Sequence, residues 1–360
     1  MIIEKVEFAE LHLMMRKPYT IAYETISEAT NFILRITTVN GLQGYGCAAP
    51  DLIITGENPE DVKSNIENML IPYLEGKNPF MREQLMNEMR MMTPGCKSTL
   101  AMVDIALYDL LARRAKLPLY MLLGGNRKSI PTCVTIGIMT VDETLREARE
   151  ILQQGFNILK IKGGISVDMD IERIIKIREH FGQQIILRFD GNQGYSADDT
   201  IKFIKELHPY GVEILEQPMG LNSEIPHILQ GPMTKVPIMA DESLKHLGDA
   251  FRIAKNQAID MVNIKIQKVG GLEQALHINS VAKAAGNEVM VGCMDECKLG
   301  IASGLHFALS RPNVQYADLD AHLDFVNDPF KGLFKIEKGV MYPYLQSGLG
   351  EINEEVLDRF

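Results

Sequence analysis

The feature that most constrains the fold is a repeat of short apolar runs that begins at residue 131. Eight runs, each with polar, helix-like sequence between it and the next, occupy residues 131–137, 157–162, 184–190, 211–216, 236–241, 260–265, 288–293 and 313–318. The charged residues that close the second to sixth runs lie 24 to 28 positions apart. One strand, one helix and two short loops need about this length. Eight such units predict an α/β protein with a (β/α)8-type barrel.

An open, doubly wound sheet is the alternative for a chain of alternating strands and helices. Such a sheet is typical of nucleotide-binding proteins and carries a glycine-rich GxGxxG turn after an early strand. We find no such turn in place, so the barrel is favoured.

The segments on either side of the repeat have a different texture. In the first 125 residues, "FILRITTVNGLQGYG" predicts a hairpin around Asn40-Gly41, and residues 58–74 and 96–116 predict helices. After residue 320 the period is lost, and "GLFKIEKGVMYP" is strand-like. We expect this last segment to pack back on the α+β opening segment.

Composition excludes several classes of protein. The formal net charge of -10 disfavours nucleic acid as a partner, because phosphate binding needs clustered Lys and Arg. No run reaches the eighteen apolar residues of a membrane span, and the acidic N-terminus predicts no signal peptide. The five cysteines form no CxxC pair. They predict reduced thiols and a cytoplasmic location.

Three carboxylates close neighbouring strands of the predicted barrel. Asp190, Glu216 and Asp241 would meet at the carboxyl end of the strands, where barrel enzymes have their active sites. Any one of them alone is more typical of a helix cap or a turn. Together they would repel one another unless a cation joined them. Oxygen ligands without His or Cys predict Mg²⁺, with Mn²⁺ as a substitute, and Asn192 and Glu242 lie beside them.

Two lysines close strands that lie half a barrel turn apart. Lys162 and Lys265 would therefore face each other across the metal. Two bases on opposite sides of one carbon suit removal of a proton from one face and its return on the other. Lys160 shares a strand face with Lys162, so its charge would disfavour protonation of Lys162, or it would bind a substrate carboxylate. Lys268 falls past the strand end, where a loop or helix-start role is expected.

With these residues assembled, the sequence resembles the muconate-lactonising-enzyme subgroup of the enolase superfamily. The matching motifs are "KIK" (160–162), "RFDGNQGY" (188–195), "EQP" (216–218), "ADES" (240–243), "NIKIQKVGG" (263–271) and "DIALYDLLARRAKLPLYMLLGG" (104–125). The resemblance implies a modified (β/α)7β TIM barrel over 126–320. It also implies an α+β capping domain, built from 1–125 together with the C-terminal segment 321–360.

Within that subgroup the chain is most similar to the dipeptide epimerases, through "ADLDAHL". The resemblance implies that Asp318 and Asp320 hold the free ammonium of a dipeptide, and that Thr135 and Glu296 line the same pocket. Lys162 and Lys265 would invert the α-carbon of the C-terminal residue by a 1,1-proton transfer. L-Ala-D/L-Glu from cell-wall peptide is the first candidate substrate. Tyr23 stands where members acting on that dipeptide commonly carry an arginine, and Lys298 is an alternative cation.

Other functions compete with this reading. Within the subgroup, an N-acylamino acid racemase, o-succinylbenzoate synthase or muconate cycloisomerase would use the same barrel, but Asp318 and Asp320 would repel their anionic substrates. A non-catalytic barrel would have no need for both lysines. A Schiff-base aldolase would have no use for three clustered carboxylates. The sequence leaves a homo-oligomer open.

Overall fold

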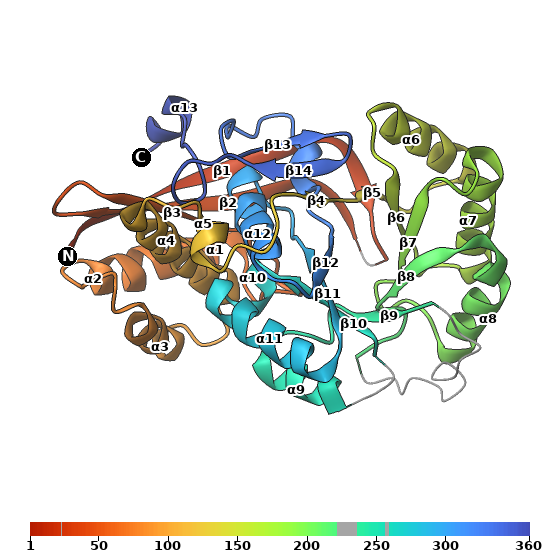
Figure 1. The fold of residues 1–360 in the computed structure, drawn as a ribbon, viewed down its shortest axis with the longest axis horizontal. Helices are drawn as coiled ribbons and strands as arrows, with labels where there is room; N and C mark the ends of the chain where they lie inside the picture. The colour runs from red at the N-terminus through yellow and green to blue at the C-terminus, as the bar shows by residue number, and fades with distance from the viewer. Residues whose placement is uncertain (23, 222–235, 256–258) are drawn as a thin grey trace.

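The structure is a computed structural model that describes residues 1–22, 24–221, 236–255 and 259–360. Figure 1 shows two parts, an N-terminal antiparallel sheet with its helices and a larger body built of alternating strands and helices. Tyr23 lies outside the described residues. In the part of the chain that is described, no helix has the length and apolar character needed to cross a bilayer.

The N-terminal part contains the predicted hairpin and helices. Its sheet has the order β1-β2-β3, with strands β1 (Ile3–Thr20), β2 (Thr25–Thr38) and β3 (Gln43–Ala48). Its helices are α1 (Pro59–Asn65), a π-helical turn (Ile66–Leu70), α2 (Ile71–Leu74), α3 (Arg82–Met92), α4 (Lys97–Ala115) and α5 (Leu119–Leu122). The helix predicted over 58–74 is thus interrupted by one wider turn.

The eight predicted strands form one parallel sheet, which confirms the barrel class. The strands are β5 (Val134–Ile136), β6 (Ile158–Lys162), β7 (Ile186–Asp190), β8 (Val212–Glu216), β9 (Ile238–Ala240), β10 (Met261–Lys265), β11 (Glu288–Gly292) and β12 (Val314–Ala317). They neighbour one another in chain order. The edges β5 and β12 meet where the Cys133 N–H donates to the carbonyl of Ala317 at 3.3 Å.

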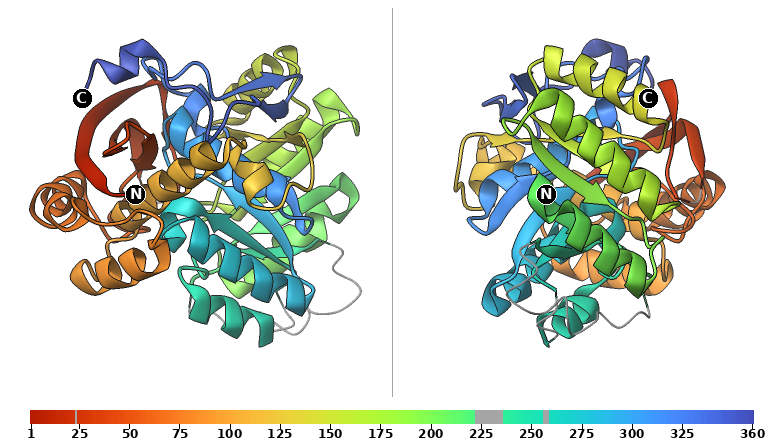
Figure 2. Two further views of the ribbon diagram at one scale, coloured as in Figure 1. Left: turned by 60° about the vertical axis from the view of Figure 1, so that its left-hand side comes forward. Right: turned by 90° about the vertical axis from the view of Figure 1, so that its right-hand side faces the viewer.

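Helices follow the strands and cover the outside of the sheet (Figure 2). They are α6 (Val141–Gln153), α7 (Val167–Phe181), α8 (Ala197–Leu207) with a 3-10 turn (His208–Tyr210), α9 (Leu247–Lys255), α10 (Ile266–Val269), α11 (Leu272–Ala285) and α12 (Lys298–Ser310). Capping boxes at Thr140 and Ser196 start α6 and α8, because each hydroxyl accepts an N–H that the first turn leaves unpaired. Inside the barrel, four buried apolar side chains from β8 to β11 pack together: Ile214, Met239, Met261 and Met290.

The first predicted strand differs from expectation. Residues 131–137 divide into β4 (Ile130–Pro131) and β5, and β4 pairs with the C-terminal hairpin rather than with the barrel. The C-terminal elements are a 3-10 turn (Ala321–Leu323), β13 (Phe334–Glu337), β14 (Val340–Pro343) and α13 (Glu354–Leu357).

The C-terminal segment also contacts the N-terminal part. Leu349 N–H donates to Asp109 on α4 at 2.7 Å, and the guanidinium of Arg35 on β2 lies 4.3 Å from the centre of the Phe360 ring. These contacts agree with an expected return of the chain, while the domain boundaries at 125 and 320 stay a prediction.

The tip of the β1–β2 hairpin reaches the carboxyl end of the barrel strands. The Thr20 carbonyl accepts from the N–H of Ile138, just after β5, at 2.8 Å. The Tyr19 hydroxyl donates to Asp295, after β11, at 2.7 Å. Asn31 on β2 donates to the Asp295 carbonyl at 2.9 Å and accepts from Cys297 N–H at 2.7 Å. The N-terminal part therefore closes over the strand ends.

Close packing of β3 on α4 supports this arrangement and depends on Gly46. A Cβ at this position would lie 1.9 Å from the carbonyl oxygen of Met102 on α4, so no larger residue fits without moving the helix. We expect Gly46→Ala to lower the free energy of unfolding by about 3 kcal/mol or more, measured by urea denaturation.

Gly41→Ala is the matched control for Gly46→Ala. Gly41 has φ +77° in the hairpin turn, with no atom within 4 Å of an added Cβ, so only backbone strain of about 1 kcal/mol is expected. If Gly46→Ala costs no more than Gly41→Ala, β3 does not pack on α4 as described.

Candidate active site

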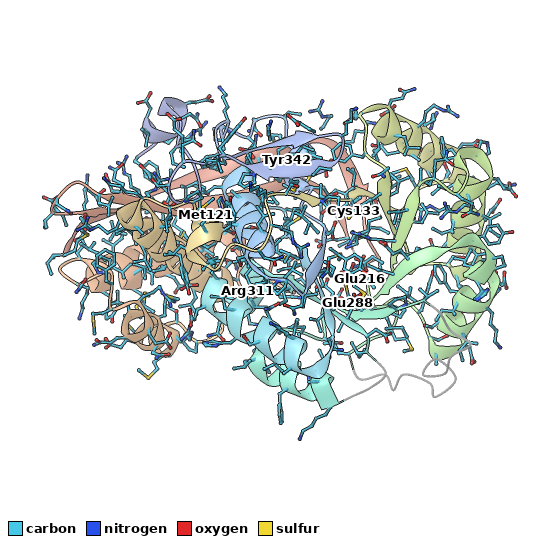
Figure 3. All side chains as sticks on the ribbon, viewed as in Figure 1. Met121, Cys133, Glu216, Glu288, Arg311 and Tyr342 are labelled. Carbon is cyan, nitrogen blue, oxygen red and sulfur yellow. The ribbon has the colours of Figure 1, made fainter. Side chains whose placement is uncertain are left out.

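The parallel register places the predicted site residues side by side. Lys162 on β6 lies beside Asp190 on β7, and Asp190 lies beside Glu216 on β8. Lys265 ends β10, while Asp241 directly follows β9 and Asp318 directly follows β12. Figure 3 labels Glu216 among the side chains of this region.

Lys160 lies at the centre of this group, almost fully buried at 2% exposure. Its Nζ is 2.7 Å from Glu216, 2.7 Å from Asp318 and 3.0 Å from Asp190. Burial disfavours its charge, but these three carboxylates raise the pKa of Lys160 well above the ordinary lysine value. Lys160 is therefore a buried counter-ion for the carboxylates. The two roles expected from the sequence, disfavouring protonation of Lys162 and binding a substrate carboxylate, stay predictions.

Lys162 is partly exposed and Lys265 is buried, and they approach the group from opposite sides. Lys162 Nζ lies 2.8 Å from Asp190, and Lys265 Nζ lies 2.9 Å from Asp241. Burial opposes the charge of Lys265, but Asp241 raises its pKa well above the ordinary value. Their strands, β6 and β10, are separated by three others in an eight-stranded sheet. Both side chains line one cavity of about 540 Å³.

The residues present fit a divalent cation. Burial and the neighbouring Asp190 raise the pKa of Glu216 to about 7, which reflects carboxylates crowded without enough positive charge. Asn192 Oδ1 and Glu242 Oε2 are buried without a hydrogen-bond partner, and both residues line the cavity. In the described residues no three His, Cys, Asp or Glu side chains converge as a ready metal site, because the lysine ammonium groups hold the carboxylates instead.

Sequence reasoning missed Lys268 and Asn263. Lys268 lies in α10 and is fully buried, with Nζ paired to the carboxylate of Asp241 and 2.6 Å from its carbonyl oxygen. Asn263 donates to Glu216 at 2.7 Å. Their spacing held the signal: Lys265 and Lys268 are three apart at a helix start, and Asn263 and Lys265 share a strand face. The expected helix-start role of Lys268 understates its place beside Asp241.

The turn after Lys162 is held by a buried clamp. Arg173 on α7, 1% exposed, donates to the carbonyl oxygen of Lys162 at 2.6 Å and pairs with Asp170 at 3.3 Å. Asp170 accepts from Gly164 N–H at 2.9 Å and from the Tyr195 hydroxyl at 2.8 Å. Gly164 has φ +105°, and a Cβ there would lie 2.1 Å from the carbonyl oxygen of Gly191. Gly164 therefore lets the loop after β6 approach the loop after β7.

Asp318 and Asp320 line the cavity, and their pKa values are shifted in opposite directions. Burial opposes the charge of Asp318, yet Lys160 lowers its pKa to about 2. Burial and Asp318 raise the pKa of Asp320 to about 6. Asp320 accepts from the backbone N–H of Thr135 at 2.6 Å, so Thr135 positions this carboxylate through its main chain. Of the two carboxylates, Asp318 is therefore the one whose charge is balanced by Lys160.

Two expected substrate contacts have other partners. Glu296 is buried and accepts from Met294 N–H at 3.0 Å and from Gln267 at 3.3 Å, and it is not among the residues that line the cavity. Its contact with a substrate stays a prediction. Lys298 likewise does not line the cavity. Its Nζ lies 4.9 Å from the centre of the Phe334 ring. Tyr23 falls outside the described residues.

Comparison with known families agrees with this site. Residues 4–124 match the N-terminal domain of mandelate racemase and muconate-lactonizing enzyme, and residues 143–356 match the enolase C-terminal domain-like family. The chain therefore belongs to the enolase superfamily, in the class that includes mandelate racemase and muconate-lactonizing enzyme.

Several relatives similar to this chain are dipeptide epimerases. An L-Lys-D/L-Arg epimerase of Desulforapulum autotrophicum is 39% identical over 94% of this chain and 96% of its own length. A substrate-liganded L-Ala-D/L-Glu epimerase of Bacillus subtilis has a TM-score of 0.93 and 36% identity, over 97% of this chain and 98% of the other. A dipeptide epimerase of Methylococcus capsulatus with Mg and L-Arg-D-Lys has the same score and identity, over 98% and 100%.

These relatives confirm three sequence predictions at the level of the family. They are isomerases, they share the barrel fold, and the Methylococcus capsulatus relative was crystallised with Mg. The names of these three relatives specify dipeptides and differ in the side chains.

Removing Lys268 tests whether it holds Asp241. Lys268→Met leaves a buried carboxylate with one partner fewer. We expect the free energy of unfolding to fall by about 3 kcal/mol or more in urea denaturation. Lys176→Met, which removes an exposed lysine paired with Glu179 on α7, is the control and should leave stability unchanged. Equal stability of the two variants would contradict a structural role for Lys268.

Proposed function

We propose that the protein is a Mg²⁺-dependent dipeptide epimerase in which Lys162 and Lys265 invert the α-carbon of the C-terminal residue. The observation that carries the proposal is the placement of these two lysines on β6 and β10. Both side chains line one cavity together with Asp241, from strands separated by three others. The buried carboxylates of Asp190 and Glu216 bind the lining lysines Lys162 and Lys160.

The two lysines exchange one proton each with the same carbon. The neutral amine of one lysine takes the α-proton as the C–H bond breaks, and the ammonium of the other donates a proton to the opposite face. Each Nζ is held by one carboxylate, Asp190 for Lys162 and Asp241 for Lys265, so each is aimed before substrate binds. Net inversion needs no other reactant.

Asp190, Glu216 and Asp241 would hold the metal. A divalent cation there supplies positive charge to the substrate carboxylate as the α-carbon loses its proton. Lys268 and Asn263 keep two of these ligands in place from the side away from the cavity.

Asp320 would bind the free ammonium of the dipeptide, with Asp318 behind it on Lys160. The names of the relatives support a dipeptide as substrate. L-Ala-D/L-Glu, the first candidate from the sequence, is one of those to be assayed. A cytoplasmic location and a role in cell-wall peptide metabolism stay predictions.

Single-lysine variants test the mechanism. With Mg²⁺ in deuterated water, the wild-type protein should exchange the α-proton of both isomers of a dipeptide substrate. We expect Lys162→Ala and Lys265→Ala each to lose epimerisation by about a thousand-fold or more. Each variant keeps one lysine and should therefore exchange the α-proton of only one isomer, as seen by proton NMR. Lys162→Ala and Lys265→Ala should exchange opposite isomers.

Dialysis against EDTA should abolish exchange by the wild-type protein, and added Mg²⁺ should restore it. Exchange that survives in both lysine variants, or that needs no divalent ion, would contradict the proposal. No exchange of any dipeptide by the wild-type protein would do so as well.

Asp320→Asn separates dipeptides from the anionic substrates of the related racemases. Asparagine fills the same space but lacks the charge, so kcat/KM for a dipeptide with a free ammonium should fall about ten-fold or more. An N-succinyl amino acid, which is anionic at that end, should gain rather than lose. The reverse pattern would favour an N-acylamino acid racemase, and steady-state polarimetry distinguishes the two.

A further inference from the structure

The cavity over the strand ends has an excess of acidic groups. Nine carboxylate side chains but only five basic side chains line it. The buried and unpaired oxygens of Asn192 and Glu242 are separate evidence that it receives a ligand. The acids of interest are those that form no ion pair with these basic side chains.

Four of the five bases already contact carboxylates. Lys160, Lys162 and Lys265 pair with the strand-end acids, and Lys17 pairs at the rim with Glu147 and Glu150 at 2.9 and 3.2 Å. The fifth, Arg16, is exposed. Among the described residues, five lining acids form no ion pair with any of these bases: Asp51, Glu242, Asp295, Asp320 and Asp324. Asp51 accepts from the N–H groups of Ile53 and Ile54, Glu242 lies beside the expected metal ligands, and Asp320 is the expected ammonium site, so Asp295 and Asp324 remain.

Asp295 is the acid nearer to the reacting centre. It follows β11, and the Tyr19 hydroxyl fixes one of its oxygens at 2.7 Å. Burial raises its pKa, while the charges of Lys162 and Lys265 reach it and act in the opposite direction. A side chain on a carbon held between those two lysines would extend toward this carboxylate.

Asp324 is the acid nearer to the expected ammonium site. It lies one turn after Asp320, and its carbonyl accepts from Arg16 N–H at 2.7 Å. Burial and the charges of Asp320, Asp295 and Glu147 raise its pKa to about 7. Nearby Arg16 lowers it to a lesser degree. A half-buried carboxylate surrounded by like charges is stabilised by a cation from outside the chain.

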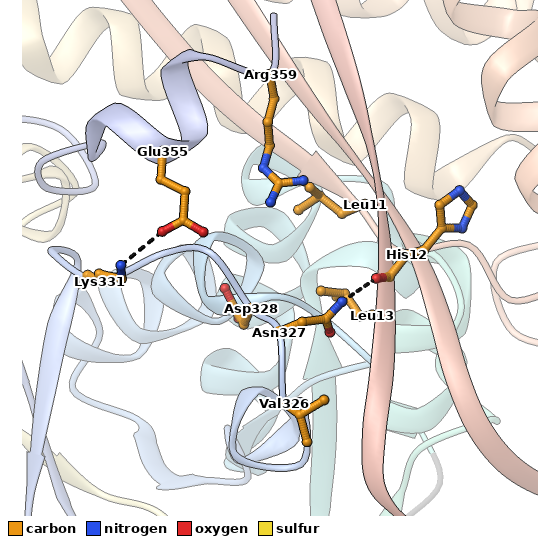
Figure 4. A pocket seen from close by; sticks show the side chains of 9 residues that line it. All are labelled: Leu11, His12, Leu13, Val326, Asn327, Asp328, Lys331, Glu355 and Arg359. Carbon is orange, nitrogen blue, oxygen red and sulfur yellow. Dashed lines mark hydrogen bonds and ion pairs between the residues drawn. The ribbon is translucent and has the colours of Figure 1, made fainter.

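A second hollow, among the described residues, shows no such excess. Between β1 and the C-terminal segment, a hollow of about 270 Å³ contains Lys331 paired with Glu355 at 2.9 Å, and Asn327 donating to the His12 carbonyl at 2.7 Å (Figure 4). Its polar groups bind one another at the surface.

We propose that the cavity selects dipeptides with a basic side chain, bound by Asp295 when it belongs to the C-terminal residue and by Asp324 when it belongs to the N-terminal one. The inference rests on the proposed epimerase function and names its substrate class. A lysyl or arginyl head group would form a charge-assisted hydrogen bond with either acid. A glutamyl side chain would bring a further carboxylate to a site that already has too many.

Isosteric dipeptides test this class. L-Ala-L-Lys is compared with L-Ala-L-norleucine, and L-Lys-L-Ala with L-norleucyl-L-Ala, because norleucine keeps the four-carbon side chain and lacks the ammonium. We expect kcat/KM for α-proton exchange to be about ten-fold or more higher for lysine than for norleucine in at least one pair. L-Ala-L-Glu should be the poorest of the set.

Two variants assign the positions. Asp295→Asn should bring the lysine-to-norleucine ratio close to one at the C-terminal residue, and Asp324→Asn should do so at the N-terminal residue. Asp198→Asn removes an exposed carboxylate in the first turn of α8, away from the cavity, and should leave both ratios as in the wild type.

The outcomes separate this inference from the function on which it rests. If norleucine dipeptides exchange as fast as lysine dipeptides, or L-Ala-L-Glu exchanges faster, the basic class is wrong while the epimerase stands. A lysine preference that survives both variants overturns the assignment to Asp295 and Asp324. If no dipeptide exchanges at all, the proposed function itself fails.

Discussion

The buried ammonium of Lys160 is the interaction on which the rest of the site depends. A single charge at 2% exposure joins β6 to carboxylates on β7 and β8 and at the end of β12. Burying any of these groups alone would cost several kcal/mol, so each is stable only with the others in place. The cluster therefore forms only when the sheet curls far enough to bring β12 to β5, next to β6, and it links the site to closure of the barrel.

Around this centre the lysines and carboxylates alternate. Lys160 pairs with Glu216, Lys162 with Asp190, and Lys265 and Lys268 with Asp241. Each of the three acids proposed to hold the metal therefore has a basic partner before a metal or substrate arrives. A bound metal would take the place of the ammonium groups beside the carboxylates, and the substrate carboxylate would take the place of the carboxylates beside the lysines. Such a site is preorganised, because its charged groups are already desolvated and aimed.

The N-terminal part contributes what the barrel lacks. Its hairpin tip closes the strand ends, and Tyr19 and Asn31 position the loop after β11 that carries Asp295. The lysines of the proposed proton transfer thus lie at strand ends, while Asp295 lies on a loop that the cap holds in place. This division agrees with relatives that share one fold and differ in the dipeptide named for each.

Much of this could be read from the sequence because the barrel repeats. The spacing of apolar runs located all eight strands, and alternation along each strand put Lys160 and Lys162, or Asp318 and Asp320, on shared faces. Contacts between residues far apart in the chain were harder to foresee. Lys160 pairs with Asp318, 158 positions away, and Lys268 turns back to Asp241, 27 positions away, which no local pattern encodes.

The sequence by itself therefore determined the elements, their order and the types of group at each strand end, since these follow from local periodicity. Only the tertiary structure decided which charges neutralise one another. It gave Lys160 three carboxylates, turned Glu296 to Met294 and Gln267, and left Asp295 and Asp324 without a basic partner among the described residues. The physical reason is that the charge state of a buried group depends on every neighbour in space, and closure of the barrel selects those neighbours.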